Sequence, residues 1–233
     1  MGVDCLMSEI YKRYMEVVDS IKNKCKQIDR DYSKIKLVAV SKTFPVEVLK
    51  EAYDSGINIF GENYAQELRD KSKVLKDYNI EWHFIGRIQI NKLKYIVPVA
   101  SLIHSVSRIE EIEVIDKISK KLGKIQEILI QVNVSGEETK SGVKPEQLID
   151  LIEKSKLYEN VKVIGLMTMA PFTDNEEIIR NVFKKARVLR DNVSKEFPDV
   201  VELSMGMSND YLIALEEGAT ILRIGSKIFG SRK

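Results

Sequence analysis

The segment Lys36-Leu37-Val38-Ala39-Val40-Ser41-Lys42 is where the fold of this chain can first be recognised. Its apolar body is typical of a buried parallel strand, and its last residue carries an amine. In α/β barrels, the carboxyl ends of the strands form the face that holds active sites. The segment therefore predicts a strand that brings the amine of Lys42 to such a face. The simpler alternative is an ordinary surface lysine at a strand end.

Strands and helices alternate along the whole 233-residue chain. The eight predicted strands cover residues 36–41, 57–61, 82–85, 102–104, 125–134, 161–167, 200–203 and 221–224. An amphipathic helix precedes them, because apolar residues from Leu6 to Ile28 recur every three or four positions. We therefore predict an α/β fold, a single-domain (β/α)8 TIM barrel with an extra N-terminal helix, over residues 1–233. A doubly wound open sheet is the alternative, but no Gly-x-Gly-x-x-Gly turn follows the first strand.

The composition argues against several classes of protein. The 37 basic and 35 acidic side chains are spread along the chain, which argues against a dedicated nucleic-acid surface. No apolar run has the length of a membrane span or the form of a signal peptide, so we expect no membrane attachment and a cytoplasmic location. Cys5 and Cys25 share one predicted helix, so no disulfide framework is expected. His83 and His104 do not form a zinc-ligand cluster, and we expect no metal site.

The loops after the last two predicted strands suit a phosphate group, which barrels often bind at this place. Gly206 allows the backbone to approach an anion closely. Ser208 is predicted to begin a helix, so its hydroxyl and the first free amides can face an anion. Gly225 and Ser226 supply a second amide and hydroxyl. The alternative is that the glycines only form turns and that Ser208 only caps a helix.

The predicted eighth strand carries Arg223 among apolar neighbours. An arginine inside a barrel must be paired, because an isolated buried charge is very costly. An outward arginine would instead form ion pairs on the surface, and the alternation along the strand leaves both orientations open. His83 could be a hydrogen-bonded core residue or a cofactor contact, and His104 could lie in the core or reach the rim.

Six motifs together resemble a known family. They are residues 36–42, Phe60-Gly61-Glu62-Asn63, Trp82-His83-Phe84-Ile85-Gly86, Gly165-Leu166-Met167, residues 203–210 and residues 223–230. This set is similar to the pyridoxal phosphate homeostasis protein family, also called the YggS or PROSC family. The resemblance covers nearly the whole chain, and it implies a fold like the N-terminal barrel of alanine racemase. Ser226 stands where threonine is common in that family, which keeps the hydroxyl, and Lys227 where a small residue is frequent.

The resemblance implies pyridoxal 5'-phosphate (PLP) as the cofactor. Lys42 would hold PLP as a Schiff base, Asn63 would lie beside its ring, and Arg223 would face the pyridine nitrogen. Five further residues would surround the phosphate: Ser204, Met207, Ser208, Gly225 and Ser226. The resemblance assigns no catalytic residue and no metal ligand.

The resemblance also implies a PLP carrier in intracellular PLP homeostasis rather than an enzyme. A guanidinium at the ring nitrogen donates a hydrogen bond but keeps its proton, which makes the ring a weaker electron sink. The chain ends soon after the last strand, so we expect no second domain with acid–base groups. Expected partners are PLP, free amino acids and PLP-dependent apo-enzymes, and we expect a monomer. The alternatives are a PLP-dependent amino-acid racemase or related enzyme, and a phosphate-binding barrel without PLP, such as an isomerase.

Overall fold

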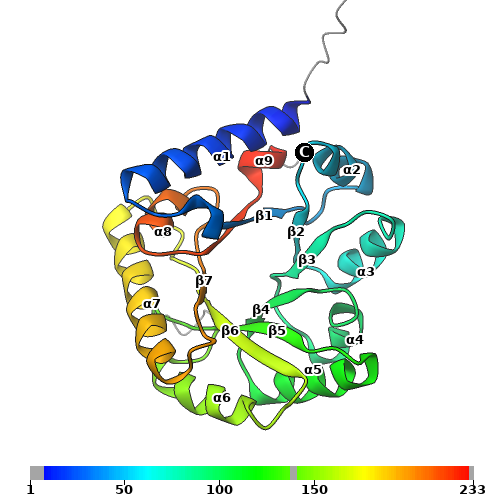
Figure 1. Ribbon diagram of the computed structural model, residues 1–233, viewed down its shortest axis with the longest axis vertical. Coiled ribbons are helices and arrows are strands. Elements are labelled where there is room, and N and C mark those ends of the chain that lie inside the picture. The colour runs from blue at the N-terminus through cyan, green and yellow to red at the C-terminus, as the bar shows by residue number, and fades with distance from the viewer. Residues whose placement is uncertain (1–7, 137–140, 231–233) are drawn as a thin grey trace, which may run out of the picture.

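Eight parallel strands close into a barrel in chain order, as the computed structural model shows for residues 8–136 and 141–230 (Figure 1). The strands are β1 (Lys36–Val40), β2 (Ile59–Glu62), β3 (Glu81–Phe84), β4 (Leu102–Val106), β5 (Gln126–Gln131), β6 (Val161–Met167), β7 (Glu202–Ser204) and β8 (Ile221–Ile224). The barrel closes where β1 pairs with β8, with Val38 opposite Arg223. The predicted barrel and its eight strands are confirmed, and the open sheet is wrong.

Helices surround the barrel (Figure 1). They are α1 (Glu9–Gln27), α2 (Val46–Asp54), α3 (Ala65–Val74), α4 (Leu93–Ile96), α5 (Ile109–Leu122), α6 (Leu148–Ser155), α7 (Glu176–Glu196), α8 (Tyr211–Glu216) and α9 (Ser226–Phe229), with 3-10 turns η1 (Tyr32–Lys34), η2 (Ile90–Lys92) and η3 (Pro145–Gln147). The predicted extra N-terminal helix is α1, which packs against α8 and α9. It buries Cys25 as a free thiol, whereas Cys5 lies outside the described residues. No helix in the described residues is both long and apolar enough to cross a membrane.

The start of α8 differs from the prediction. We predicted a helix beginning at Ser208, but α8 begins at Tyr211 with Asp210 at its N-cap position. The reason is local, because the carboxylate of Asp210 accepts a hydrogen bond from the Met207 amide at 2.6 Å. Residues 208–210 therefore form a turn before the helix. The four-residue α9 was not predicted, since so short a helix shows no periodicity in the sequence.

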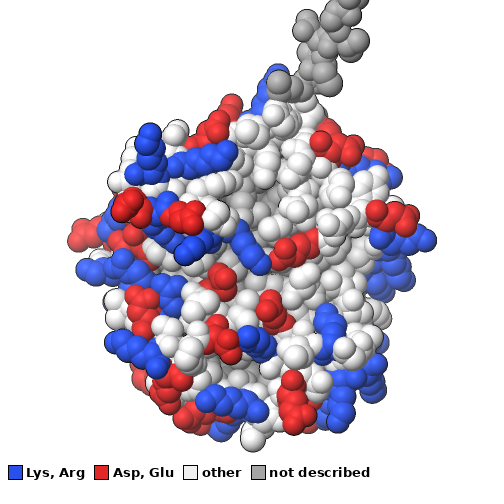
Figure 2. Space-filling model, viewed as in Figure 1, with Lys and Arg blue, Asp and Glu red and all other residues white. Residues whose placement is uncertain are grey.

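The core has two parts that differ in chemistry. Apolar side chains fill the space between the strands and the surrounding helices in one large cluster. Inside the barrel, a small apolar cluster contains Val38, Leu102, Leu129, Met167 and Ile221. The interior also holds polar groups, because Ser204 of β7 contacts His104 of β4, and these strands are not neighbours. On the face in Figure 2, acidic and basic side chains are mixed, in line with the balanced composition.

Candidate functional site

Lys42 follows β1 after one residue, Ser41, and is half-buried in a tight turn. The amide of Phe44 donates to the carbonyl of Ser41 at 3.1 Å, which places Lys42 and Thr43 at the two central positions. Thr43 has φ of +70°, a conformation that costs a residue with a Cβ about 1–2 kcal/mol. The turn therefore needs support from its surroundings to keep this backbone conformation.

That support comes from three charged side chains, Glu62, Glu67 and Lys71, which we call the Lys71 clamp. The ammonium of Lys71 donates to the carbonyl of Ser41 at 2.9 Å, to Glu62 Oε1 at 2.7 Å and to Glu67 Oε2 at 2.9 Å. Glu67 Oε2 also accepts the backbone amide of Thr43 at 2.9 Å. The clamp thus holds the peptide groups on both sides of Lys42.

Glu62 is the most deeply buried member of the clamp. Its Oε1 also accepts the hydroxyl of Ser41 at 2.6 Å, and its Oε2 has no hydrogen-bond partner within the described residues. Burial raises the pKa of Glu62 to about 7, against the opposing effect of the Lys71 charge. Near neutral pH, this carboxyl group is therefore close to the point at which it gains or loses a proton.

Arg223 points into the barrel and is almost fully buried. Its Nη1 donates to Ser204 Oγ at 2.5 Å, and its Nη2 donates to the carbonyl of Thr168 at 3.1 Å. Within the described part of the chain, no carboxylate lies within ion-pair distance of this guanidinium. Burial lowers the pKa of Arg223 to about 10, so the group stays charged at neutral pH. A buried cation in this position favours a ligand that offers an acceptor atom.

A line of polar side chains continues from Arg223 through the barrel interior. Ser204 Oγ lies 2.9 Å from His104 Nδ1, and His104 Nε2 lies 2.9 Å from His83 Nδ1. His83 Nε2 in turn lies 2.8 Å from Glu81 Oε1. We call this line the histidine chain: its members are Arg223, Ser204, His104, His83, Glu81 and Lys36, whose ammonium pairs with Glu81. His83 is thus a hydrogen-bonded core residue, and His104 does not reach the rim.

The direction of each hydrogen bond in the histidine chain follows from charge. Burial lowers the pKa of both His83 and His104, so each ring is neutral and offers one donor and one acceptor. The pKa of Glu81 is lowered to about 2, mainly by its hydrogen bond with His83. Glu81 is therefore a carboxylate and accepts a hydrogen bond from the Nε2–H of His83. His104 must then donate from Nε2 to His83, and Ser204 must donate to His104. All these hydrogen bonds therefore point from Arg223 towards Glu81.

The two loops proposed for phosphate lie against each other. The hydroxyl of Ser208 accepts the amide of Gly225 at 3.3 Å, and Ser226 is exposed at the start of α9. Gly206 has φ of +91°, and a Cβ there would lie 2.5 Å from the Cβ of Ala214, so only glycine fits. The amide of Met207 donates to Asp210 and is not available to an anion, while the Met207 side chain is exposed.

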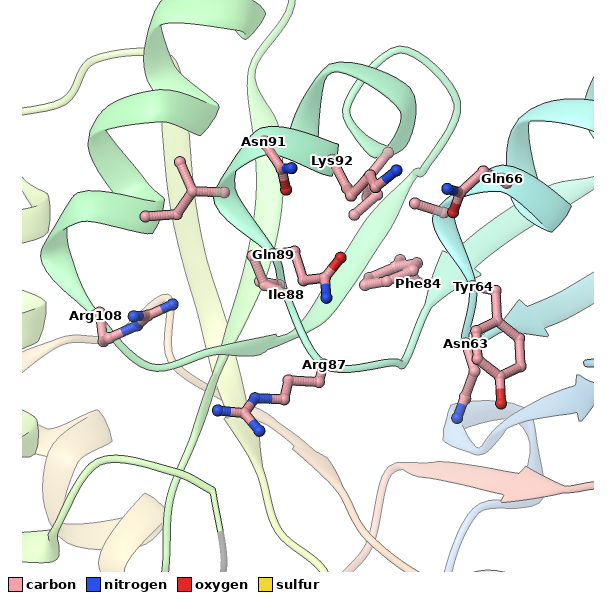
Figure 3. A pocket seen from close by; sticks show the side chains of 13 residues that line it. Asn63, Tyr64, Gln66, Phe84, Arg87, Ile88, Gln89, Asn91, Lys92 and Arg108 are labelled. Atoms are coloured by element: carbon pink, nitrogen blue, oxygen red, sulfur yellow. The ribbon is translucent and has the colours of Figure 1, made fainter.

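Asn63 directly follows β2 and lies at one end of a groove of about 880 Å³ (Figure 3). The backbone of Asn63 packs tightly against Gly86, where a Cβ would lie 1.9 Å from the Asn63 carbonyl oxygen. The groove is lined by Arg87, Lys92 and Arg108, of which Arg108 forms an ion pair with Glu111. Arg87 and Lys92 are the lining cations that favour an anion in this groove.

The structure brings the predicted residues to three neighbouring places. Lys42 and Asn63 follow the adjacent strands β1 and β2, and Arg223 and Ser204 contact each other inside the barrel. Ser208 and Gly225 join the β7 and β8 loops. The members of the Lys71 clamp were not predicted. The sequence gives little indication of them, because the i, i+4 spacing of Glu67 and Lys71 is that of an ordinary surface ion pair on a helix.

The chain is similar to known proteins along most of its length. The profile of the family described as alanine racemase, N-terminal domain, matches residues 18–233. The pyridoxal phosphate homeostasis protein of Aquifex aeolicus (strain VF5) is 46% identical over 223 residues, which cover 95% of this chain and 98% of that protein.

Solved structures show the same likeness in three dimensions. PipY of Synechococcus elongatus PCC7942 with PLP bound has a TM-score of 0.79 and 31% identity, over 90% of this chain and 100% of PipY. Alanine racemase of Clostridium difficile 630 shares the fold, with a TM-score of 0.72 and 15% identity. That match covers 92% of this chain but only 56% of the racemase chain.

Proposed function

Because the chain belongs to the pyridoxal phosphate homeostasis protein family, within the wider family of the alanine racemase N-terminal domain, we propose that it binds PLP reversibly and serves intracellular PLP homeostasis. The observation that carries this proposal is Arg223, a buried cation that forms no ion pair among the described residues, although the charge of Asp210 raises its pKa from beyond ion-pair distance. The pyridine nitrogen of PLP is an acceptor that meets this need. The PLP-bound structure of PipY, at 31% identity, supports the same cofactor here.

Each proposed contact uses a chemical group that the structure presents near the C-terminal ends of the strands. The amine of Lys42 forms a C=N bond with the aldehyde carbon of PLP and releases water. Asn63 lies beside the ring, and Arg223 donates a hydrogen bond to its nitrogen. The hydroxyl of Ser204 holds Arg223 in place rather than contacting phosphate, because it already accepts from Arg223 and contacts His104.

The phosphate is assigned to the loops that follow β7 and β8. The hydroxyls of Ser208 and Ser226 are the proposed donors. The amide of Gly225 donates to Ser208 and positions its hydroxyl, while Met207 contributes only its exposed side chain. A hydrogen bond to a charged group contributes about 1.5–3 kcal/mol. Ser208→Ala should therefore weaken PLP binding by about tenfold or more, measured by equilibrium dialysis. Unchanged binding in Ser208→Ala, Ser226→Ala and their double variant would contradict this assignment.

The geometry favours a carrier over an amino-acid racemase, the second candidate. An arginine at the ring nitrogen keeps its proton, since the pKa of Arg223 is about 10, and the ring then withdraws electrons only weakly. The carboxylates that contact the Lys42 turn, Glu62 and Glu67, are both hydrogen-bonded to Lys71 and are poorly placed for acid–base work. We infer that PLP itself, free amino acids and PLP-dependent apo-enzymes are the partners of a cytoplasmic monomer.

Borohydride reduction tests the covalent site. Reduction of the PLP-loaded protein, followed by peptide mapping, should place the adduct on Lys42 and on no other lysine. Lys42→Ala should lose the visible absorption of the C=N bond, whereas Lys73→Ala, which changes an exposed lysine on α3, should keep it. An adduct found mainly on another lysine would overturn the assignment.

Exchange of the α-hydrogen of an amino acid distinguishes a carrier from a racemase. The loaded protein is incubated with L-alanine in deuterated water, and deuterium at the α-carbon and chirality are followed against free PLP and Lys42→Ala. We expect exchange no faster than with free PLP, together with transfer of PLP to an apo-enzyme. Lys42-dependent exchange at rates on the order of 1 s⁻¹, as in ordinary enzymes, would favour the racemase.

A further inference from the structure

The turn that carries Lys42 is held from outside by a set of charges converging on a few atoms. Lys71 reaches the carbonyl of the peptide group before Lys42, and Glu67 reaches the amide of the peptide group after it. These two side chains also contact each other at 2.9 Å, so they form one rigid unit on α3. The Cα of Lys42 therefore lies between two peptide groups that are both fixed by the same helix.

A purely structural role does not account for this choice of residues. Lys71 is 6% exposed and Glu62 is fully buried. Buried ion pairs seldom stabilise a protein more than apolar side chains of similar size. Charges at this place do, however, bind both peptide groups of a turn that contains Thr43 at φ of +70°. Such a conformation persists only when its surroundings impose it.

We propose that Glu67 and Lys71 are positioning residues for the amine of Lys42, which they direct towards the PLP aldehyde by fixing the turn of residues 41–44. This proposal rests on the proposed function, since it concerns the same lysine. Glu62 has a supporting role: it accepts hydrogen bonds from Lys71 and from Ser41, and it holds the ammonium over the Ser41 carbonyl. Neither Glu67 nor Lys71 forms a bond with PLP.

The expected effect is on capture of the aldehyde rather than on docking of the phosphate and ring. If the turn is no longer fixed before PLP binds, the backbone of a residue must be ordered during binding. Ordering it costs about 1–2 kcal/mol of conformational entropy, which corresponds to about tenfold in affinity. The affinity for PLP should therefore fall about tenfold in Lys71→Met, and borohydride trapping at equal occupancy should slow. Pyridoxamine phosphate has an amine in place of the aldehyde and cannot condense with Lys42, so its affinity should stay within about twofold.

Three further variants keep the test decisive if Lys71→Met folds poorly. Glu67→Gln retains an oxygen that can accept the Thr43 amide, whereas Glu67→Ala does not. We expect Glu67→Ala to lose PLP affinity several-fold and Glu67→Gln to remain near the wild type. Lys73→Met removes an exposed charge from the same helix and serves as the matched control, with no expected change.

The outcomes distinguish this inference from the function on which it rests. If the wild type forms no C=N bond with PLP, the proposed function fails. If the wild type forms it and Glu67→Ala and Lys71→Met bind PLP as tightly as Lys73→Met, the positioning role alone is overturned. Equal losses for PLP and pyridoxamine phosphate would also overturn it, because they would indicate a general disturbance of the site.

Discussion

The Lys71 clamp and the histidine chain are two buried polar networks in one barrel, and they use opposite chemistry. In the clamp, two carboxylates share one ammonium, and all three side chains are charged or close to a change of charge. The interior of the histidine chain is neutral, with charge only at Arg223 and at the half-exposed pair of Glu81 and Lys36. The clamp holds a backbone turn, whereas the histidine chain holds a guanidinium.

This difference in charge matches the group that each network holds. A strained turn exposes a peptide carbonyl and amide, and charged groups make the strongest hydrogen bonds to them. Arg223 already carries a charge, so a second cation beneath it would be repelled. Neutral rings and a hydroxyl avoid that repulsion, and each ring nitrogen and the hydroxyl still has a hydrogen-bond partner. Three measurements test whether the two networks differ in this way.

The largest effect should follow removal of the charge at the centre of the clamp. Lys71→Met leaves Glu62 buried without its cation, and breaking a buried ion pair in this way costs about 3–5 kcal/mol. We expect a loss of about 3 kcal/mol in the free energy of unfolding at pH 8, measured by urea denaturation. The loss should be smaller at pH 5, where Glu62 is protonated and needs no cation.

Lys36→Met is the matched variant at the end of the histidine chain. Lys36 and Glu81 form an ion pair whose side chains are 43% and 37% exposed, and such pairs contribute only about 0–1 kcal/mol. Equal losses of stability in Lys36→Met and Lys71→Met would remove the distinction between the two networks.

The pH dependence of stability should differ in sign between the networks. Folding raises the pKa of Glu62 from 4.5 to about 7, so its contribution is complete below pH 4.5 and lost as the pH rises through 7. Folding lowers the pKa of His83 and His104 below 6.5, so their contribution is present above pH 6.5 and lost as the pH falls.

Urea denaturation from pH 4.5 to 8 measures both contributions. Glu62→Gln should abolish the decline of stability towards pH 7 and leave the acid-side loss in place. A variant with glutamine at both histidine positions should show the reverse. An unchanged pH profile in Glu62→Gln would mean that this carboxyl group does not change its charge near neutral pH.

The smallest effect is spectroscopic and concerns the direction of the histidine chain. Nitrogen-15 NMR should show both imidazoles as the tautomer protonated at Nε2, with no conversion to imidazolium until well below pH 6.5. A signal from His104 protonated at Nδ1 would reverse its hydrogen bond to Ser204 and would contradict the derived direction.

The sequence was informative about the barrel because strand burial and helix periodicity are local signals. The eight strands and α1 were predicted within a few residues, whereas the orientation of Arg223 was left open by the alternation along its strand. The start of α8 was wrong, since the carboxylate of Asp210 accepts the Met207 amide and residues 208–210 form a turn before the helix. The start of the helix depends on the backbone of the turn, which composition does not reveal.

The buried networks could not be predicted, because they join residues far apart in the chain. Ser204 and His104 are separated by 100 positions, and Lys71 contacts a carbonyl 30 positions away. A lysine in a helix or a histidine in a strand has many uses, and only the closed barrel selects one of them. The proposed roles of Lys42, Asn63 and the phosphate loops came from the family resemblance and stay predictions.

The single direction of the histidine chain also constrains how the sequence can vary. From Arg223 to His83 each member donates to the next, so a change at one of these positions leaves a buried donor or acceptor without its partner. Positions 83, 104, 204 and 223 should therefore be inherited as a unit. A relative that replaces His104 with an apolar residue should carry compensating changes at the neighbouring positions of the histidine chain. Single substitutions at these positions should therefore be rare, and the barrel interior should diverge through several substitutions made together.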